Sequence, residues 1–422
     1  QKDESIWLAE DVDVAVGENR LTVNGQIETG SSGVTEIDID ASGPNIAFIQ
    51  DFTDLQGIPA RPYEVSATVR PDPLGILVDD GVGVFGENRI ELDGVVALQA
   101  GLDGTTLDVA FSGPDLHTVR LLTDVPYLPT GPFDASGRVR FSGDNLLLED
   151  VEASVAELQA AANGAVGIGG HNVGGFNLDI ALSGPDVAAL PEIEGIEDFR
   201  GDSFSVAGTL VRQGERISAA GLKVTLGELE ANLDGYVIGP GRLADVTVSA
   251  NTTDTEVVRK LAKLAYLPEG VATLDGKIEK TETDIRFSNT ALSIGGLRAE
   301  ANGTLSLSPR SNDSDLAFRI TGPNLQRFGM AFGISTLSDR DFSLSGQFHG
   351  TSSGFAMNDF AVTVGENDLG GRFDADLRGK PRIVGVFDSD HLDLTYALSR
   401  PSNDIEEAES EPAPDEEGGR LF

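Results

Sequence analysis

The sequence predicts a mainly β protein: an elongated, curved antiparallel β-sheet built from about six repeats of ~70 residues. A short helix or loop lies between repeats, and the inner face of the sheet is expected to form a hydrophobic groove. Three observations lead to this expectation: strands of alternating apolar and polar residues, hairpin turns that recur every 68 to 71 residues, and a Ser-Gly-Pro signal that ends one strand per repeat.

The alternating strand is clearest between Phe133 and Phe141, where every odd position is apolar or small and every even position is polar. A period of two is typical of a strand that is buried on one face only. The same pattern returns in four further segments. Their small central residue, and that of this strand, falls at Ala67, Gly137, Gly208, Gly276 and Gly346.

A hairpin follows the same period. Its turn position is occupied by Gly17, Gly86, Ala156, Gly227, Gly295 and Gly365. Three copies share the turn sequence Gly-Glu-Asn, and turns rich in Gly and Asn are typical of β-hairpins. A second glycine follows eight residues later at Gly25, Gly94, Gly164, Gly235 and Gly303, and Phe373 breaks this pattern in the last copy. Two independent features on one period make a chance repeat improbable.

A Ser-Gly-Pro or Thr-Gly-Pro sequence closes a third type of strand. It occurs at residues 42–44, 112–114, 183–185 and 321–323, with a degenerate copy near Ser249-Ala250-Asn251. Pro lacks the N–H that a ladder requires, so each strand is expected to stop there. One connection then reads as a helix: between Thr253 and Pro268 the apolar residues Val257, Leu261, Leu264 and Ala265 share a face.

The repeats predict one extended β domain over residues 1–400 rather than a row of separate domains. Its units are expected at approximately 1–61, 62–131, 132–202, 203–269, 270–341 and 342–400. Residues 401–422 change in character, with eight acidic residues and two prolines between Asp404 and Glu417. Such a composition predicts an acidic disordered tail or linker.

The composition excludes several classes of function. With 30 Lys and Arg against 69 Asp and Glu, the net charge is −39, which repels phosphate backbones and argues against nucleic-acid binding. The chain has no cysteine, so disulfides, thiolate nucleophiles and Cys-ligated metals are absent. No stretch approaches the roughly 18 to 20 apolar residues of a membrane-spanning helix.

No catalytic, cofactor or metal site is expected either. The four histidines, His117, His171, His349 and His391, lack metal-type spacing, and His349 falls on the polar face of its strand. A single glycine-rich copy at residues 169–175 resembles a calcium-binding nonapeptide, but such sites need several in tandem. Residues 312–315 lack the Gly and the closing Glu of an EF-hand. We therefore expect a protein that is not an enzyme.

About four strands per unit give about 24 strands, and at ~4.8 Å per strand the sheet would be ~115 Å long. One short helix per unit cannot shield the apolar face of four strands. Either the sheet folds over on itself, or the apolar face stays partly open as a groove for an apolar partner.

The last repeat resembles the terminal module of the AsmA-like family of bacterial envelope proteins, which includes TamB-type and YhdP-type relatives and, more distantly, the bridge-like lipid-transfer proteins. The residues that carry the resemblance are the small-residue strand at 342–346, Val364-Gly365 followed by Leu369-Gly370-Gly371, Gly379-Lys380-Pro381, and the Ser-x-x-Leu-Asp-Leu ending at 389–394. The resemblance implies an inner-membrane helix that this chain lacks, a repeat region in the periplasm of a Gram-negative-type bacterium, and a role in outer-membrane biogenesis.

On this reading the protein is a non-enzymatic conduit whose partners are phospholipid acyl chains. Its contact with membranes would be made by the missing N-terminal helix or by proteins that cap the two ends. The apolar residues of the alternating strands would line the groove: Val65, Val69, Phe133, Val139, Phe141, Phe204, Leu210, Leu274, Ile278, Phe342, Leu344 and Phe348.

A second reading belongs to a different class of protein. The repeats could form a structural or adhesive surface array in which each apolar face is closed into a sandwich, with calcium in the junctions. This reading predicts discrete domains, whereas the lipid conduit predicts one continuous sheet.

Overall fold

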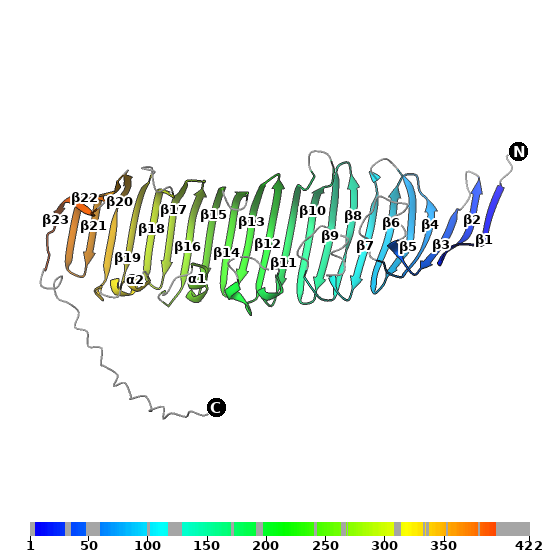
Figure 1. Ribbon diagram of the computed structural model, residues 1–422, viewed down its shortest axis with the longest axis horizontal. Coiled ribbons are helices and arrows are strands. Elements are labelled where there is room, and N and C mark those ends of the chain that lie inside the picture. The colour runs from blue at the N-terminus through cyan, green and yellow to red at the C-terminus, as the bar shows by residue number, and fades with distance from the viewer. Residues whose placement is uncertain are drawn as a thin grey trace, which may run out of the picture.

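The chain folds into 23 strands and a few short helices in the computed structural model (Figure 1). The structure describes residues 5–29, 35–47, 60–98, 102–116, 129–169, 173–190, 197–239, 243–262, 267, 269–307, 314–331, 334, 337–351, 353–378 and 380–393. The predicted acidic tail, residues 401–422, lies outside these.

The strands are 7 to 12 residues long and follow one another along the whole described chain. They are β1 (Ser5–Val16), β2 (Asn19–Thr29), β3 (Glu36–Gly43), β4 (Tyr63–Pro71), β5 (Gly75–Phe85), β6 (Asn88–Ala97), β7 (Thr106–Gly113), β8 (Phe133–Ser142), β9 (Asn145–Val155), β10 (Leu158–Gly167), β11 (Phe176–Gly184), β12 (Phe204–Gln213), β13 (Arg216–Leu226), β14 (Leu229–Ile238), β15 (Leu243–Thr252), β16 (Ala272–Lys280), β17 (Asp284–Ile294), β18 (Leu297–Ser306), β19 (Asp315–Gly322), β20 (Phe342–Thr351), β21 (Gly354–Val364), β22 (Asn367–Asp376) and β23 (Arg382–Asp388). The helical elements are η5 (Val187–Ala189), η6 (Glu197–Phe199), α1 (Thr255–Ala262) and α2 (Leu325–Ala331).

Every strand pairs antiparallel with the next strand in sequence, so the sheet is one long open meander. The ladder also crosses the predicted unit boundaries, because β3 pairs with β4, β7 with β8, β11 with β12, β15 with β16 and β19 with β20. The mainly β, extended antiparallel architecture is therefore confirmed. The predicted range 1–61 holds three described strands and each later range four, which gives 23 strands rather than about 24.

The hairpin turns have the backbone that the repeated sequence predicts. All six turn positions have positive φ between 51° and 65°, including Ala156 in place of glycine. Positive φ at the first loop residue is characteristic of two-residue hairpins. In the last copy, where Phe373 occupies the place of the second glycine, a glycine with φ 134° lies two residues earlier, at Gly371.

A β-bulge interrupts the strand that precedes each of these turns. Between Glu149 and Glu152 in β9, for example, the register with β8 shifts, and Asp150 adopts φ 50°. The freed Asp150 N–H donates to Asn163 Oδ1 at 2.7 Å on β10. In two other repeats the equivalent bulge N–H also donates to a side-chain oxygen: Asp80 N–H donates to Asp93 Oδ1, and Gly221 N–H donates to Asp234 Oδ1. Because bulges bend a strand and increase its twist, this row curves the sheet about its long axis.

The second glycine, present on the strand after the turn in the first five copies, allows two backbones to approach closely. A Cβ at Gly235 would lie 2.0 Å from the carbonyl oxygen of Asp245 on β15, and Gly235 has φ 135°. No other residue combines this backbone conformation with this space. The glycine that the sequence repeats is thus required by the bend in the sheet.

The connections between β11 and β12 and after β15 cover one long edge of the sheet, the lower edge in Figure 1, where α1 and α2 lie. A buried cluster forms beneath them from Leu158, Val187, Phe199, Phe204, Leu226 and Val257. Asp186 fixes this cover, because its carboxylate accepts from Ala188 N at 2.7 Å and from Gly201 N at 2.8 Å. These two bonds lower the pKa of Asp186.

An aromatic ring at the start of one strand packs on a glycine at the end of its neighbour. Gly184 lies opposite Phe204, and a Cβ at Gly184 would meet the ring at 2.8 Å. In the fourth copy the larger residue takes the place of the glycine and a small residue takes the place of the aromatic ring. Thr252, which is 1% exposed, lies opposite Ala272. The degenerate strand ending is therefore centred on Thr252, at the end of β15, rather than on residues 249–251.

The predicted helix after β15 is shorter than the interval 253–268. Its first turn is capped by Asp254, whose Oδ1 accepts from Glu256 N at 2.8 Å. Val257 is buried as expected, whereas Leu261 is 45% exposed. Leu264 and Ala265 lie outside the described residues.

Candidate apolar binding face

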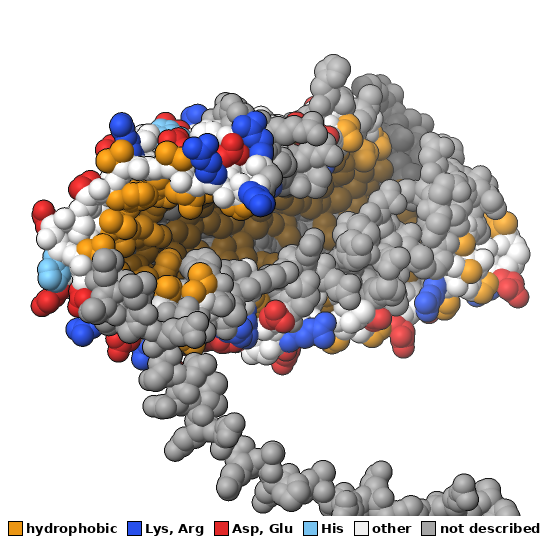
Figure 2. Space-filling model, turned by 60° about the vertical axis from the view of Figure 1, so that its left-hand side comes forward, with side chains coloured by type: hydrophobic (Ala, Val, Ile, Leu, Met, Phe, Trp, Pro, Cys, Tyr) orange, Lys and Arg blue, Asp and Glu red, His pale blue; other side chains and the backbone are white. Residues whose placement is uncertain are grey.

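One face of the sheet, here called the concave face, carries the apolar positions of the alternating strands. Figure 2 shows a hollow in which hydrophobic side chains gather along the length of the molecule, while acidic and basic side chains lie on the outer surface. The alternation explains this division: along β8 the odd-numbered residues are buried or half-buried and the even-numbered residues are exposed.

Cross-strand register places these residues in rows perpendicular to the strands. One such row runs across five strands: Val139, Leu148, Gly164, Leu178 and Leu210. Neighbours in the row are directly opposed, so Val139 lies within reach of Leu148 and Leu178 within reach of Leu210, while Gly164 separates the two pairs. The bulge at Asp150 shifts the alternation of β9 by one residue. Leu148 therefore lies on the concave face on one side of the bulge, and Ala153 and Val155, opposite Ala135 and Phe133, lie on the same face on the other side. The concave face is consequently apolar along the sheet as well as along each strand.

Nine of the twelve predicted groove residues are half-buried: Val65, Val69, Val139, Phe141, Leu210, Leu274, Ile278, Leu344 and Phe348. The other three, Phe133, Phe204 and Phe342, are only 5–6% exposed. They begin their strands and are buried in the core, whereas the other nine are partly open to solvent. Phe204 is buried with Val187 and Phe199 of the connection before it, and that connection has no alternating pattern.

The twelve predicted residues lie on one strand per repeat, and the prediction omits the apolar side chains that the neighbouring strands add to the concave face. Leu146 and Leu148 of β9 lie opposite Phe141 and Val139, and both are half-buried. A signal was available, because the bulge residues recur on the same period at Asp80, Asp150, Gly221, Asn289 and Asp359. Had these bulges been recognised in the sequence, the residues of the bulged strands that lie on the concave face could also have been predicted.

A chain of phenylalanine contacts distinguishes the C-terminal end of the face. Phe348 stacks on Phe355 at 5.4 Å between ring centroids, and Phe373 packs edge-on against both Phe355 and Phe360. Phe387 extends the cluster to the last strand. The last described unit is thus lined by aromatic rings where β8 to β12 present mainly aliphatic side chains.

The long edge opposite the covered one also carries exposed apolar residues. Leu98, Ile168, Leu307 and Leu377 each follow the last residue of an equivalent strand, and they are 44–71% exposed. The backbone of each is held by the neighbouring hairpin, as in the bond from Leu307 N to Thr283 O at 2.7 Å. These residues continue the apolar alternation beyond the strand ends, so this edge of the concave face is open and apolar.

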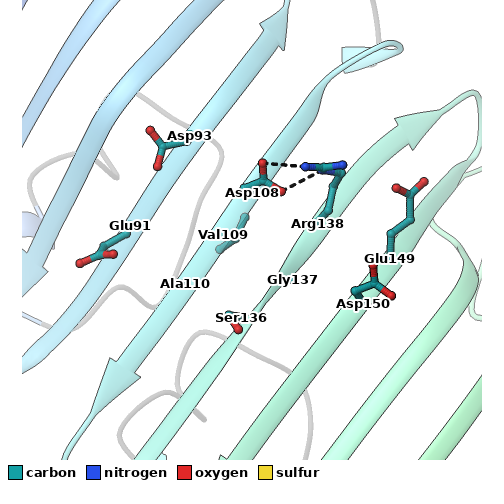
Figure 3. Close-up of a pocket in the computed structure, with 10 residues that line it drawn as sticks. All are labelled: Glu91, Asp93, Asp108, Val109, Ala110, Ser136, Gly137, Arg138, Glu149 and Asp150. Carbon is teal, nitrogen blue, oxygen red and sulfur yellow. Dashed lines mark hydrogen bonds and ion pairs between the residues drawn. The ribbon is translucent and has the colours of Figure 1, made fainter.

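The outer, convex face is polar. Figure 3 shows a shallow depression there, bordered by acidic side chains that surround Arg138. Arg138 donates from Nε and Nη2 to the two carboxylate oxygens of Asp108, at 2.8 and 3.0 Å. The bonds from Arg138 lower the pKa of Asp108, which keeps that carboxylate ionised and paired. The arrangement is an exposed ion pair on a solvated strand face and supplies no acid–base pair.

The described residues hold no group of three or more His, Asp or Glu side chains arranged to bind a metal. His349 lies on the outer face as expected, with Nδ1 3.4 Å from an Asp315 carboxylate oxygen. His117, His171, residues 170–172 of the glycine-rich copy and residues 312–313 lie outside the described part of the chain. Among the helices that are described, none has the length and apolar character to span a bilayer.

Comparison with protein-family models, curated proteins and solved structures finds no match to this chain.

Proposed function

We propose that this protein is a non-enzymatic envelope protein whose concave face forms a hydrophobic groove that conducts or shields phospholipid acyl chains between the inner and outer membranes. On this proposal the repeat region lies in the periplasm of a Gram-negative-type bacterium and is anchored at the inner membrane. The transferred lipid supports outer-membrane biogenesis.

The observation that carries the proposal is an apolar face that continues along one open sheet, with few of its side chains buried among the described residues. Only fourteen hydrophobic side chains of the described residues are buried, and most of these lie at the strand ends. The remaining apolar side chains of the concave face are half-exposed, as are those of the row from Val139 to Leu210. A contiguous exposed apolar surface of this kind marks a binding site for an apolar partner.

The chemistry of acyl chains fits such a surface. Burial of one CH₂ group contributes about 0.8 kcal/mol and has no directional requirement, so neighbouring positions along the groove bind a chain almost equally well. Lipid would therefore slide from row to row without hydrolysis by this chain. The open edge at Leu98, Ile168, Leu307 and Leu377 would leave the polar headgroup in water.

The alternative, an adhesive array with closed cores, needs a second sheet or layer over each apolar face. The described strands form one sheet, and among the described residues η5, η6 and α1 contribute to a single buried cluster at one of its long edges. Calcium-dependent stabilisation of the purified chain would favour this alternative.

Transfer of a fluorescent phospholipid between vesicles tests the proposal. Phe141→Asp places a charge on the concave face, whereas Ser142→Asp places the same charge on the next residue, which points to solvent. We expect the first variant to lose most of the transfer rate and the second to retain it. Equal rates of phospholipid transfer by the native protein and a folded Phe141→Asp variant would contradict the proposal.

A further inference from the structure

The last strand, β23, presents an edge that is unlike every other strand of its type. The corresponding strands β3, β7, β11, β15 and β19 are each paired on both sides, but β23 pairs with β22 alone among the described residues. All seven of its residues are exposed. Its apolar residues Ile383, Val384, Val386 and Phe387 are 50–66% exposed.

This edge also lacks the features that prevent edge-to-edge pairing. Natural edge strands are blunted by lysines, prolines or bulges. Between Arg382 and Asp388 there is no lysine and no proline, and the β22–β23 register has no bulge. Both faces of β23 are apolar, since Ile383 and Phe387 lie on the concave face and Val384 and Val386 on the convex face. An exposed edge strand with apolar residues on both faces is a favourable site for pairing with another chain.

The sequence of β23, Arg-Ile-Val-Gly-Val-Phe-Asp, is complementary to itself when read in the opposite direction. Centred on Gly385, an antiparallel pair of two copies sets Arg382 of one opposite Asp388 of the other, twice. It also sets Ile383 opposite Phe387 on the concave face and Val384 opposite Val386 on the convex face. Opposite charges and apolar pairs at directly opposed positions both stabilise an antiparallel ladder. Within the described residues neither Arg382 nor Asp388 makes an ion pair.

We propose that β23 is a dimerisation edge at which a second copy of this chain pairs antiparallel through its own β23. The two-fold axis is perpendicular to the sheet and passes midway between the two copies of Gly385. Rotation about such an axis keeps the same face of both sheets on the same side. The dimer would therefore join two concave faces into one sheet of twice as many strands. This inference does not depend on what the concave face binds.

The other end of the sheet does not offer an equivalent site. The sequence of β1 (Ser5–Val16) contains three acidic residues and no basic one, so it is not complementary to itself in charge when read in the opposite direction. Head-to-tail pairing of β23 with β1 of another copy is also a poorer fit. All odd-numbered strands run in the same direction, so continuing the sheet in this way would require a parallel pair, whereas all pairs within the chain are antiparallel.

Sedimentation velocity of the purified chain over about a hundredfold range of micromolar concentrations tests the proposal. A seven-residue edge is smaller than a standard interface, so we expect a reversible dimer with micromolar affinity. Arg382→Asp and Asp388→Arg should each weaken self-association about tenfold or more, because each variant opposes like charges twice. An equimolar mixture of the two variants should form a heterodimer, since both charge pairs are then restored.

The double variant R382D/D388R should recover the native dimer, and circular dichroism should show that all variants remain folded. A native chain that stays monomeric throughout the range would overturn the proposal. So would an Arg382→Asp variant that dimerises like the native chain, or a mixture of single variants that fails to associate.

Discussion

Phe204 and Leu210 lie on the same strand, on the same face and in the same alternating pattern, yet their side chains differ in solvent exposure. Phe204 is 6% exposed beneath the connection that contains η5 and η6. Leu210 is half-buried six residues further along β12 and lies outside the buried cluster that contains Phe204. The strand pattern decides which face a side chain occupies, and the connections decide whether that face is closed. The uncovered part is the one available to a ligand.

The largest effect expected from this comparison is on stability. Phe204→Ala should destabilise β11 to β13 by about 3 to 5 kcal/mol, because it opens a cavity in the closed core. Leu210→Ala should cost only about 1 kcal/mol, because much of that side chain is already in water. Hydrogen exchange measured strand by strand is the suitable readout, since a long array need not unfold in one step. Equal costs for the two substitutions would contradict the division into core and open face.

A second comparison concerns the curvature that creates the concave face. Gly235→Ala should destabilise β14 and β15 by about 3 kcal/mol or more, because its Cβ would lie 2.0 Å from the Asp245 carbonyl oxygen. Gly214→Ala is the control, at a turn with φ 61° and nothing within 4 Å of an added Cβ. That change should cost only the backbone strain of about 1 to 2 kcal/mol. A milder effect at Gly235 than at Gly214 would remove close approach as the reason for the repeated glycine.

Much of this architecture could be predicted from the sequence because it rests on local patterns. The alternation from Phe133 to Phe141 identifies β8 and its apolar face, and the turns at Gly17 and Gly365 identify hairpins. Burial of Phe204 could not be predicted in the same way, because it depends on Leu158 and Val257, which are distant in sequence and join it in the buried cluster. The bulge at Asp150 could have been predicted, because Asp, Asn or Gly recurs at the equivalent position of the other repeats.

The smallest effect expected is a gain. Tyr63 donates from its hydroxyl to Asn19 Oδ1 at 3.3 Å, whereas the equivalent pair in the next copy is Phe133 and Asn88. Asn88 Oδ1 is buried without a hydrogen-bond partner. Phe133→Tyr should supply that partner and stabilise β7 and β8 by about 0.5 to 1.5 kcal/mol. Thermal unfolding and hydrogen exchange would detect it, and a destabilised variant would show that the two sites are not equivalent.

The measurement that tests the central claim most directly is solvent extraction of the purified chain, followed by mass spectrometry of the extract. Phe141→Asp and Ser142→Asp serve as matched variants on the concave and convex faces. The account predicts co-purifying phospholipid in the native chain and in Ser142→Asp, and much less in a folded Phe141→Asp. A native chain that is free of lipid and takes up none from vesicles would contradict an open acyl-binding face.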